Sequence, residues 1–290
     1  MSYAKPEYLI KPEALASSLG APELKVFDAT VHLVPAEKGY RAESGLADYG
    51  EGHVPGAAFL DQIRAVSDTS TGLGFSLPSP DALQEGLRAV GIGNGDRIVL
   101  YSTGHMMWAT RAWWLLHYAG LDNVAVLNGG FRAWQAAGLE TSTEATTFPA
   151  GDVTVRPRSE RFVDQAQVLA AIGDEAVCTV NALSPDVYTG EGKMSYGRKG
   201  HITGSVNVFY DQLLDEGRFR PAAELEAALS SKGLLAADRV IAYCGGGISA
   251  TIDALACLLV GKEEVAVYDG SMSEWVRDDS LPMTLGSEPG

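Results

Sequence analysis

The sequence predicts two α/β domains in tandem, each a mostly parallel sheet flanked by helices. Landmarks of the first half recur in the same order in the second half, and short apolar runs alternate with helical segments in both. Such alternation is typical of a parallel sheet covered by helices on both faces. We place the domains at residues 1–145 and 146–290, with a linker rich in Thr, Pro and Gly around Thr141–Asp152.

The internal duplication consists of four matching pairs of segments. In chain order, FDA at 27–29 matches VNA at 180–182, GHVPGA at 52–57 matches GHITGS at 200–205, GIGNGDRIVLYSTG at 91–104 matches GLLAADRVIAYCGG at 233–246, and VAVLNGGFRAW at 124–134 matches VAVYDGSMSEW at 265–275. The separation between partners shrinks along the chain, so the first half carries extra loop residues. Chance does not explain four collinear matches, and each half is therefore expected to form one domain.

The predicted elements also correspond between the halves. Pro80–Val90 has apolar residues at helical spacing, a Pro-Asp start and Gly91 as a stop, and Ala222–Leu229 is its partner. The predicted buried strands are Lys25–Phe27, Ile98–Tyr101 and Val124–Leu127 in the first half, and Val177–Val180, Val240–Tyr243 and Val265–Tyr268 in the second.

Composition excludes several classes of protein. The chain is 46% hydrophobic and 20% charged, which is globular, and its net charge of −15 without a basic stripe argues against nucleic-acid binding. The longest apolar stretch, around Leu255–Val260, is too short to span a bilayer, and the first residues do not have the pattern of a leader. Three cysteines match neither a disulfide framework nor a zinc site. We therefore expect a cytoplasmic protein without membrane contact, metal or disulfides.

One cysteine lies where α/β proteins place their chemistry. Cys244 follows the strand RVIAY and precedes an apolar helix, and the carboxyl ends of parallel strands are the usual site of catalysis. Three glycines follow it, so the backbone can curl and point amide groups inward at the positive end of the helix dipole. A thiolate or persulfide would be favoured in such a nest, formed by Gly245, Gly246, Gly247, Ile248, Ser249, Ala250 and Thr251.

The alternative for Cys244 is a buried structural cysteine before a helix cap. Packing does not explain three adjacent glycines, and the first half has Ser102 at the matching position, so the chemical interpretation is favoured. For Cys178, in a predicted buried strand, and Cys257, in a predicted buried helix, the structural interpretation is favoured.

The chain resembles the tandem-domain rhodanese family of thiosulfate and 3-mercaptopyruvate sulfurtransferases along nearly its whole length. The motifs that carry the resemblance are EGHVPGAAFLD, TRAWWLLHYAG and LNGGFRAW in the first half, and SPDVYTGEG, GHITGSVNV, YCGGGISAT and YDGSMSEW in the second. The resemblance implies two rhodanese-like domains, the first non-catalytic and the second catalytic. It also implies a nucleophile at Cys244, a sulfur-cradling loop at 245–251, and no metal or organic cofactor.

The implied reaction is a double displacement. The Cys244 thiolate takes a sulfane sulfur from a small anionic donor, and the resulting persulfide passes it to a thiol or cyanide acceptor. A thioredoxin-like protein is a candidate reductant, and a monomer is expected. Within this class we slightly favour 3-mercaptopyruvate over thiosulfate, because Gly245-Gly246 stands where thiosulfate-specific members tend to carry a cationic pair.

Other positions depart from the family pattern. The loop has Gly246 where mercaptopyruvate-specific members typically have a serine, and Leu183 and Val187 stand where two arginines usually bind the donor. Arg198, Lys199 and His53 are the candidate substrate-binding residues, and their alternatives are a solvated basic turn for the first two and a structural turn histidine for the third.

Two other functions compete with sulfur transfer. A phosphatase of related fold needs a Cys-x5-Arg loop, whose arginine binds phosphate, and the loop after Cys244 contains no arginine. A persulfide relay carrier, or a rhodanese-like binding module with little small-molecule activity, is the second rival, since the usual donor-binding arginines are replaced.

Overall fold

The computed structural model describes residues 2–35 and 40–290. It divides into two compact units, an N-terminal unit of Pro6–Arg158 with Glu216–Arg218, and a C-terminal unit of the segment through Lys5, Ser159–Asp215 and Phe219–Gly290. The N-terminal unit runs past the boundary expected at 145/146. It does so because residues 151–158 hydrogen-bond back to it, for example from Arg156 N to Ala119 O at 2.9 Å and from Arg158 N to Tyr118 O at 2.8 Å.

The N-terminal unit is built on a five-stranded parallel sheet in the order β1-β7-β6-β2-β5. Its strands are β1 (Leu9–Ile10), β2 (Leu24–Asp28), β5 (Ala58–Phe59), β6 (Arg97–Tyr101) and β7 (Val124–Leu127), with an antiparallel hairpin of β3 (Val31–Pro35) and β4 (Tyr40–Ser44). Its helices are η1 (Pro6–Tyr8), α1 (Pro12–Ala16), α2 (Leu46–Glu51), α3 (Gln62–Ala65), α4 (Pro80–Ala89), α5 (Met107–Tyr118) and α6 (Gly130–Ala136).

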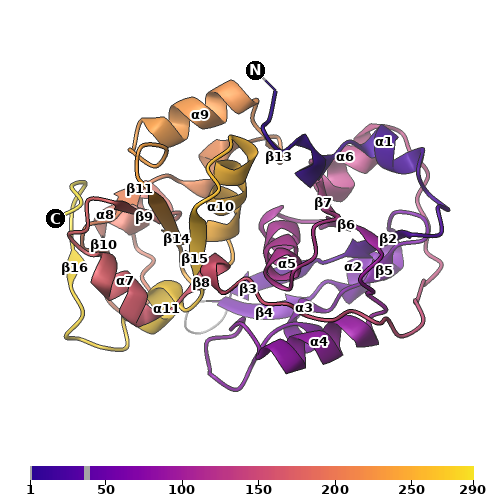
Figure 1. Cartoon of the computed structure of the whole chain (residues 1–290), viewed down its shortest axis with the longest axis horizontal. Helices are drawn as coiled ribbons and strands as arrows, with labels where there is room; N and C mark the ends of the chain where they lie inside the picture. Colours follow the sequence, from indigo (N-terminus) through magenta and orange to yellow (C-terminus); the bar gives the residue numbers. More distant parts are fainter. Residues whose placement is uncertain (1, 36–39) are drawn as a thin grey trace. The chain divides into compact units, whose positions relative to one another are not determined.

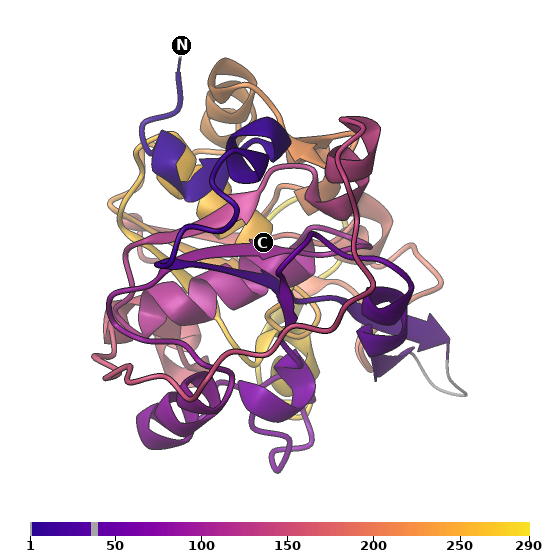
Figure 2. The same ribbon diagram turned by 90° about the vertical axis from the view of Figure 1, so that its right-hand side faces the viewer.

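Helices cover both faces of this sheet. Val99 and Tyr101 share one face of β6 and pack in a core cluster with Leu15 of α1 and Trp134 of α6. The buried helix α5 packs against β6 and β7 and runs alongside the strands (Figure 2). Ile98 and Leu100 alternate along β6 with Val99 and Tyr101, so their side chains point to the opposite face of the sheet, away from that cluster.

The C-terminal unit repeats this arrangement strand for strand. Its parallel sheet has the order β11-β9-β14-β15-β8, and the helix α10 lies against β14 and β15 (Figure 1). The strands of this sheet are β8 (Phe162–Val163), β9 (Val177–Asn181), β11 (Val206–Asn207), β14 (Arg239–Tyr243) and β15 (Val265–Tyr268). The remaining elements after residue 158 are η2 (Ser159–Arg161), α7 (Gln165–Ala171), α8 (Pro185–Thr189), β10 (His201–Ile202), η3 (Tyr210–Leu213), β12 (Leu214–Asp215), β13 (Arg218–Phe219), α9 (Ala222–Ser230), α10 (Ala250–Leu259), α11 (Ser271–Trp275) and β16 (Met283–Thr284), and Arg218 of β13 belongs to the N-terminal unit.

The duplication extends to individual hydrogen bonds. Tyr101 at the end of β6 accepts a bond from Val54 N at 3.2 Å, and Tyr243 at the end of β14 accepts one from Ile202 N at 3.0 Å. Each GH turn also stacks its histidine on a tyrosine, with ring centroids 3.9 Å apart for Tyr49–His53 and 3.7 Å apart for Tyr188–His201. The four matched sequence segments therefore form the same framework in both units.

The predicted elements are present with small changes at their ends. The helix predicted at Pro80–Val90 is α4, with Ser79 Oγ accepting a cap bond from Ala82 N at 3.3 Å and Gly91 following at a φ of +91°. The extra residues of the first half, expected as loop, include the hairpin β3–β4. Cys178 lies on β9 as predicted, but its side chain is only partly buried.

Candidate active site

Cys244 directly follows β14, the middle strand of the C-terminal sheet. It is 2% exposed, and the loop from Gly245 to Ser249 joins it to α10. The strand ends here because the glycines cannot continue its side-chain packing and Gly247 adopts a φ of +73°, where a Cβ would meet Asp269 O at 2.5 Å. The sulfur therefore lies at the carboxyl edge of the sheet and at the amino end of a fully buried helix.

The segment that follows β15 fixes this loop. Ser271 Oγ accepts hydrogen bonds from Cys244 N at 3.1 Å and from Gly247 N at 3.0 Å. Met272 N donates to Cys244 O at 3.0 Å, and Ser273 donates to Gly245 O through both its backbone N at 2.8 Å and its Oγ at 2.7 Å. The loop is therefore held from α11 as well as by its own strand and helix.

Some loop amides already have protein acceptors, and others do not. Gly247 N bonds Ser271 Oγ, and Thr251 N donates to Ile248 O at 3.1 Å. The backbone N–H groups of the other loop residues before the helix, Gly245, Gly246, Ile248 and Ser249, have no hydrogen-bond partner within the described ranges. A group of backbone donors at a helix amino end is an anion-binding arrangement.

A tyrosine lies directly against the first glycine of the loop. A Cβ built on Gly245 would meet the hydroxyl oxygen of Tyr196 at 2.0 Å and its Cζ at 2.2 Å, whereas on Gly246 the nearest atom would be Ser273 Oγ at 3.9 Å. Tyr196 thus occupies the space into which any side chain at 245 would project. Tyr196 was not predicted from the sequence, because nothing in its local motif connects it to a loop nearly fifty residues away.

The sequence matches the rhodanese-like domain family at residues 11–137 and again at 164–278. It is 30% identical to the 3-mercaptopyruvate sulfurtransferase of Escherichia coli K12 over 95% of this chain and 97% of that protein. It is 33% identical to the thiosulfate sulfurtransferase of Rattus norvegicus over 91% and 89% of the two chains. A crystal structure of the E. coli 3-mercaptopyruvate enzyme superposes with a TM-score of 0.81 at 29% identity, covering 91% of this chain and 98% of that one.

This chain belongs to the rhodanese family. The expected family and the expected fold class, two tandem domains of this type, are confirmed. The described part of the chain has no helix with the length and apolar character needed to cross a bilayer.

The candidate substrate-binding residues lie in three different settings. His53 is fully buried in the N-terminal unit, with Nδ1 2.7 Å from Tyr49 O and Nε2 3.1 Å from Glu144 O. Arg198 belongs to the C-terminal unit and donates to Asp278 O at 3.1 Å and Leu281 O at 2.9 Å, whereas Lys199 is exposed. In the part of the chain that the structure describes, neither Arg198 nor Lys199 forms a hydrogen bond or an ion pair with the Cys244 loop, and their roles remain predictions.

Two buried apolar side chains, Leu183 and Val187, stand at the positions where arginines were expected from the family pattern. Leu183 is 9% and Val187 is 8% exposed, and Asn181 is fully buried with its Oδ1 accepting a bond from Leu183 N at 2.8 Å. No cationic side chain replaces an arginine at these two positions themselves.

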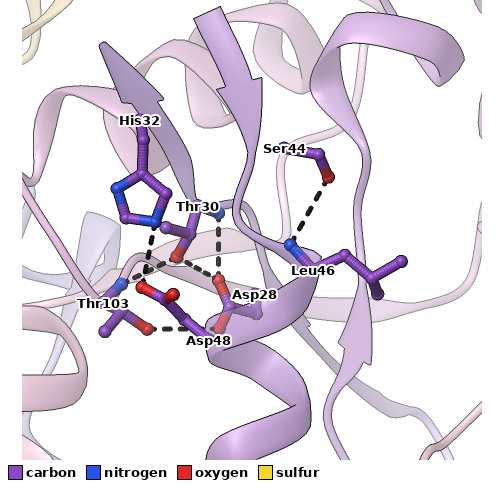
Figure 3. Close-up of polar contacts among 7 residues, drawn as sticks. All are labelled: Asp28, Thr30, His32, Ser44, Leu46, Asp48 and Thr103. Carbon is purple, nitrogen blue, oxygen red and sulfur yellow. Dashed lines mark hydrogen bonds and ion pairs between the residues drawn. The ribbon is translucent and has the colours of Figure 1, made fainter. Parts of the chain in front are cut away.

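The N-terminal unit carries a polar network at the place of the active loop. Ser102, the counterpart of Cys244, donates to His105 O at 2.8 Å and is 1% exposed. Beside it, Asp28 accepts bonds from Thr30 N at 2.9 Å and from the Thr30 hydroxyl, and Thr103 N donates to Thr30 Oγ1 at 2.8 Å (Figure 3). The hydroxyl that stands in for the thiol is therefore engaged within its own loop.

The two other cysteines are poor nucleophiles. Burial raises the pKa of the Cys178 thiol to about 11, with the charge of Lys262 opposing it. Burial also raises the pKa of Cys257, and the nearby Asp253 carboxylate adds to this effect. Both thiols are therefore protonated at neutral pH.

Asp253 is a site residue that the sequence analysis missed. It lies in the first turn of α10, is fully buried, and both of its carboxylate oxygens lack a hydrogen-bond partner in the described part of the chain. An Asp within the otherwise apolar run ATIDALACLL is the sequence signal that could have identified it, because ionisable groups are seldom fully buried without a partner.

Proposed function

We propose that Cys244 carries a persulfide in a double-displacement sulfur transfer from a small anionic donor to a thiol or cyanide acceptor. The sequence predicts a sulfurtransferase. The relatives in E. coli and R. norvegicus are sulfurtransferases, and the similarity to them covers most of both chains. The observation that carries the mechanism is that four backbone amides of the loop after Cys244 have no acceptor within the described ranges, namely those of Gly245, Gly246, Ile248 and Ser249.

Each step of the transfer places a negative charge on sulfur near these amides. The Cys244 thiolate attacks the outer sulfur of the donor, a new S–S bond forms, and the electron pair of the broken bond leaves with the remainder of the donor. The product is a terminal persulfide anion, which the unpaired amides and the amino end of α10 stabilise. An acceptor thiolate or cyanide then attacks the terminal sulfur, and the pair of that S–S bond returns to Cys244 as thiolate.

The loop favours 3-mercaptopyruvate over thiosulfate as donor. Thiosulfate is a dianion, and Gly245 and Gly246 offer it backbone dipoles but no cationic side chain. The ring of Tyr196 also fills the space that a basic residue at 245 would need. With 3-mercaptopyruvate the leaving group is the pyruvate enolate, which takes up one proton.

The surroundings of the reaction are part of the same proposal. We expect a monomer in the cytoplasm, with a thioredoxin-like protein as a reductant, because three cysteines that match neither a disulfide framework nor a zinc site fit a reducing compartment. The alternative, a relay carrier or binding module with little small-molecule activity, is not favoured, since the similarity to the enzymes spans nearly the whole chain.

The test is to incubate the protein separately with thiosulfate and with 3-mercaptopyruvate, and to weigh it intact by mass spectrometry. We expect 3-mercaptopyruvate to add one sulfur to the wild type and to Cys178→Ser, but none to Cys244→Ser. Loading by thiosulfate alone would reverse the donor assignment. No loading by either donor, with Cys244 reduced and accessible, would overturn the small-molecule function.

A further inference from the structure

The most unusual polar group in the C-terminal unit is the carboxyl of Asp253. It is fully buried, neither oxygen has a hydrogen-bond partner within residues 2–35 and 40–290, and no basic side chain pairs with it there. An ionised carboxylate in that state is strongly destabilising, so the group is expected to be protonated in the folded protein or to have a function.

The Asp253 side chain lies on the side of the first turn of α10 that is nearer to the Cys244 loop along the helix axis. The helix starts at Ala250, only a few residues after Cys244, and Asp253 is in its first turn. Because side chains of a helix lean toward its amino end, the carboxyl of Asp253 leans toward the Cys244 loop. Electrostatics agree with this placement, since burial and then the charge of the Cys244 thiolate raise the pKa of Asp253 well above its ordinary value.

A third ionisable group adjoins this pair. The half-buried Tyr210 belongs to η3, which packs against α10. Burial raises the pKa of Tyr210, and the charges of Asp211, Cys244 and Asp253 raise it further. The Tyr210 hydroxyl is therefore close enough to the sulfur and to the carboxyl for both charges to act on it.

In the described ranges no cation acts on Asp253, and the charge of Lys262, just beyond the end of α10, acts on Cys257 instead. The helix α9, whose buried residues are Ala222, Leu225 and Leu229, packs on α10, and so does the apolar strand β15. Tyr243 at the end of β14 is engaged by Ser205 and Ile202. Within α10, Cys257 is a neutral thiol whose pKa the Asp253 charge raises. Cys244, Tyr210 and Cys257 are thus the titratable groups coupled to Asp253 in the described ranges, and none is a cation.

We propose that Asp253 and Cys244 share a proton, so that the carboxyl stays neutral while the sulfur is a thiolate and the pair carries one negative charge. Both groups lie at the amino end of the same helix, which stabilises one nearby anion far better than two adjacent ones. Asp253 is then a positioning residue that acts through Cys244, because its own side chain is fully buried and does not reach a donor in solvent.

This proposal rests on Cys244 being the reacting sulfur, but its test does not need sulfur transfer. Alkylation by iodoacetamide reports the thiolate directly and requires no donor. If neither donor loads the protein, the proposed function fails while the alkylation profile still decides the role of Asp253.

The experiment is the pH dependence of the Cys244 alkylation rate, followed by intact mass, in the wild type and in Asp253→Asn. Cys244→Ser measures the background from Cys178 and Cys257. We expect two steps in the wild type, separated by at least about one pH unit, because the carboxyl ionises against an existing thiolate at the higher pH. Asp253→Asn should lose the upper step and keep a single one.

Asp28→Asn is the matched control, since it removes a buried carboxyl from the N-terminal unit, and it should keep both steps. Superimposable profiles for the wild type and Asp253→Asn would overturn the proposal. If Asp253→Asn does not fold, the infrared difference spectrum of the wild type on alkylation decides. A protonated-carboxyl band that changes in the wild type but not in Cys244→Ser supports the shared proton, and the absence of such a change rejects it.

Discussion

Ser271 Oγ accepts a hydrogen bond from the backbone N–H of Cys244 at 3.1 Å, and it does so from a residue with a φ of +48°. The matching position in the N-terminal unit is Gly130, at a φ of +59°. A positive φ is costly for serine and not for glycine. The hydroxyl compensates, because it also accepts from Gly247 N and donates to Tyr268 O at 2.8 Å. The unit that holds the thiol therefore has a serine at the position where the other unit has a glycine.

The first prediction concerns this hydroxyl. Ser271→Ala keeps the strained backbone but removes the hydroxyl that accepts from two buried amides, so we expect it to lower the free energy of unfolding by about 1–3 kcal/mol. Ser271→Gly loses the same bonds but relieves the backbone, and should be more stable than the alanine variant by roughly 1 kcal/mol. Urea denaturation measures both, and sulfur loading should slow in both. An alanine variant with wild-type stability and loading would contradict the assigned role.

The second prediction compares adjacent glycines. Gly245→Ala places a methyl group within 2.0 Å of the Tyr196 hydroxyl, whereas Gly246→Ala meets nothing closer than 3.9 Å. We expect Gly245→Ala to slow persulfide loading by at least about tenfold, as a displacement of the loop on the order of 1 Å does in other enzymes. Gly246→Ala should load at nearly the wild-type rate. The measurement is the initial rate of the one-sulfur mass gain.

Removing the tyrosine tests the cause of this difference. In the double variant Gly245→Ala with Tyr196→Ala, the added methyl group has room, so loading should recover relative to Gly245→Ala alone. A double variant no faster than the single one would show that the clash with Tyr196 is not what limits the loop.

The fold could be predicted largely from the sequence, because the evidence for it is local and repeated. Strand β7 has the predicted limits Val124–Leu127, and α4 ends one residue before the predicted Val90. The signals for these elements, apolar runs and the stop at Gly91, lie within the elements themselves or directly beside them in the sequence. The matched GH turns also predicted a common framework, which the stacked pairs Tyr49–His53 and Tyr188–His201 form.

Much of the site could not be predicted in this way. Tyr196 reaches Gly245 only through the folding of the chain, and the hydrogen bonds of Ser271 depend on how α11 approaches the loop. The glycine-rich sequence indicated a nest of amides, but not that the amide of Gly247 is already bonded to Ser271. Such contacts depend on tertiary packing between segments distant in sequence, and a single sequence contains no direct record of them.

The third prediction concerns His53. Both of its ring nitrogens contact backbone carbonyls and its side chain is fully buried, so His53→Asn should destabilise the protein by about 1–3 kcal/mol. The loading rate per folded molecule should be unchanged. His201→Asn is the matched variant, since His201 Nδ1 lies 2.9 Å from Tyr188 O in the same arrangement. A loss of loading with His53→Asn, at unchanged stability, would instead give this residue a part in donor binding.

The fourth prediction is a stability slope caused by Asp253. Burial first, and then the Cys244 charge, raise its folded-state pKa well above 3.8, so between these two values the folded protein holds a proton that the unfolded chain has lost. The stabilising contribution of this group is therefore complete below about pH 4 and is lost as the pH rises toward the folded pKa. The loss amounts to at most about 1.4 kcal/mol per pH unit.

Asp253→Asn removes the titrating group, so its stability relative to the wild type should increase from pH 4 toward neutral pH. The comparison is made by urea denaturation at a series of pH values, with Asp253→Asn and the wild type measured in parallel. Both chains share every other titrating group, and the difference between their unfolding free energies therefore isolates this carboxyl. A difference that is constant with pH would mean that Asp253 is ionised in the folded protein, and it would require a buried partner for its charge.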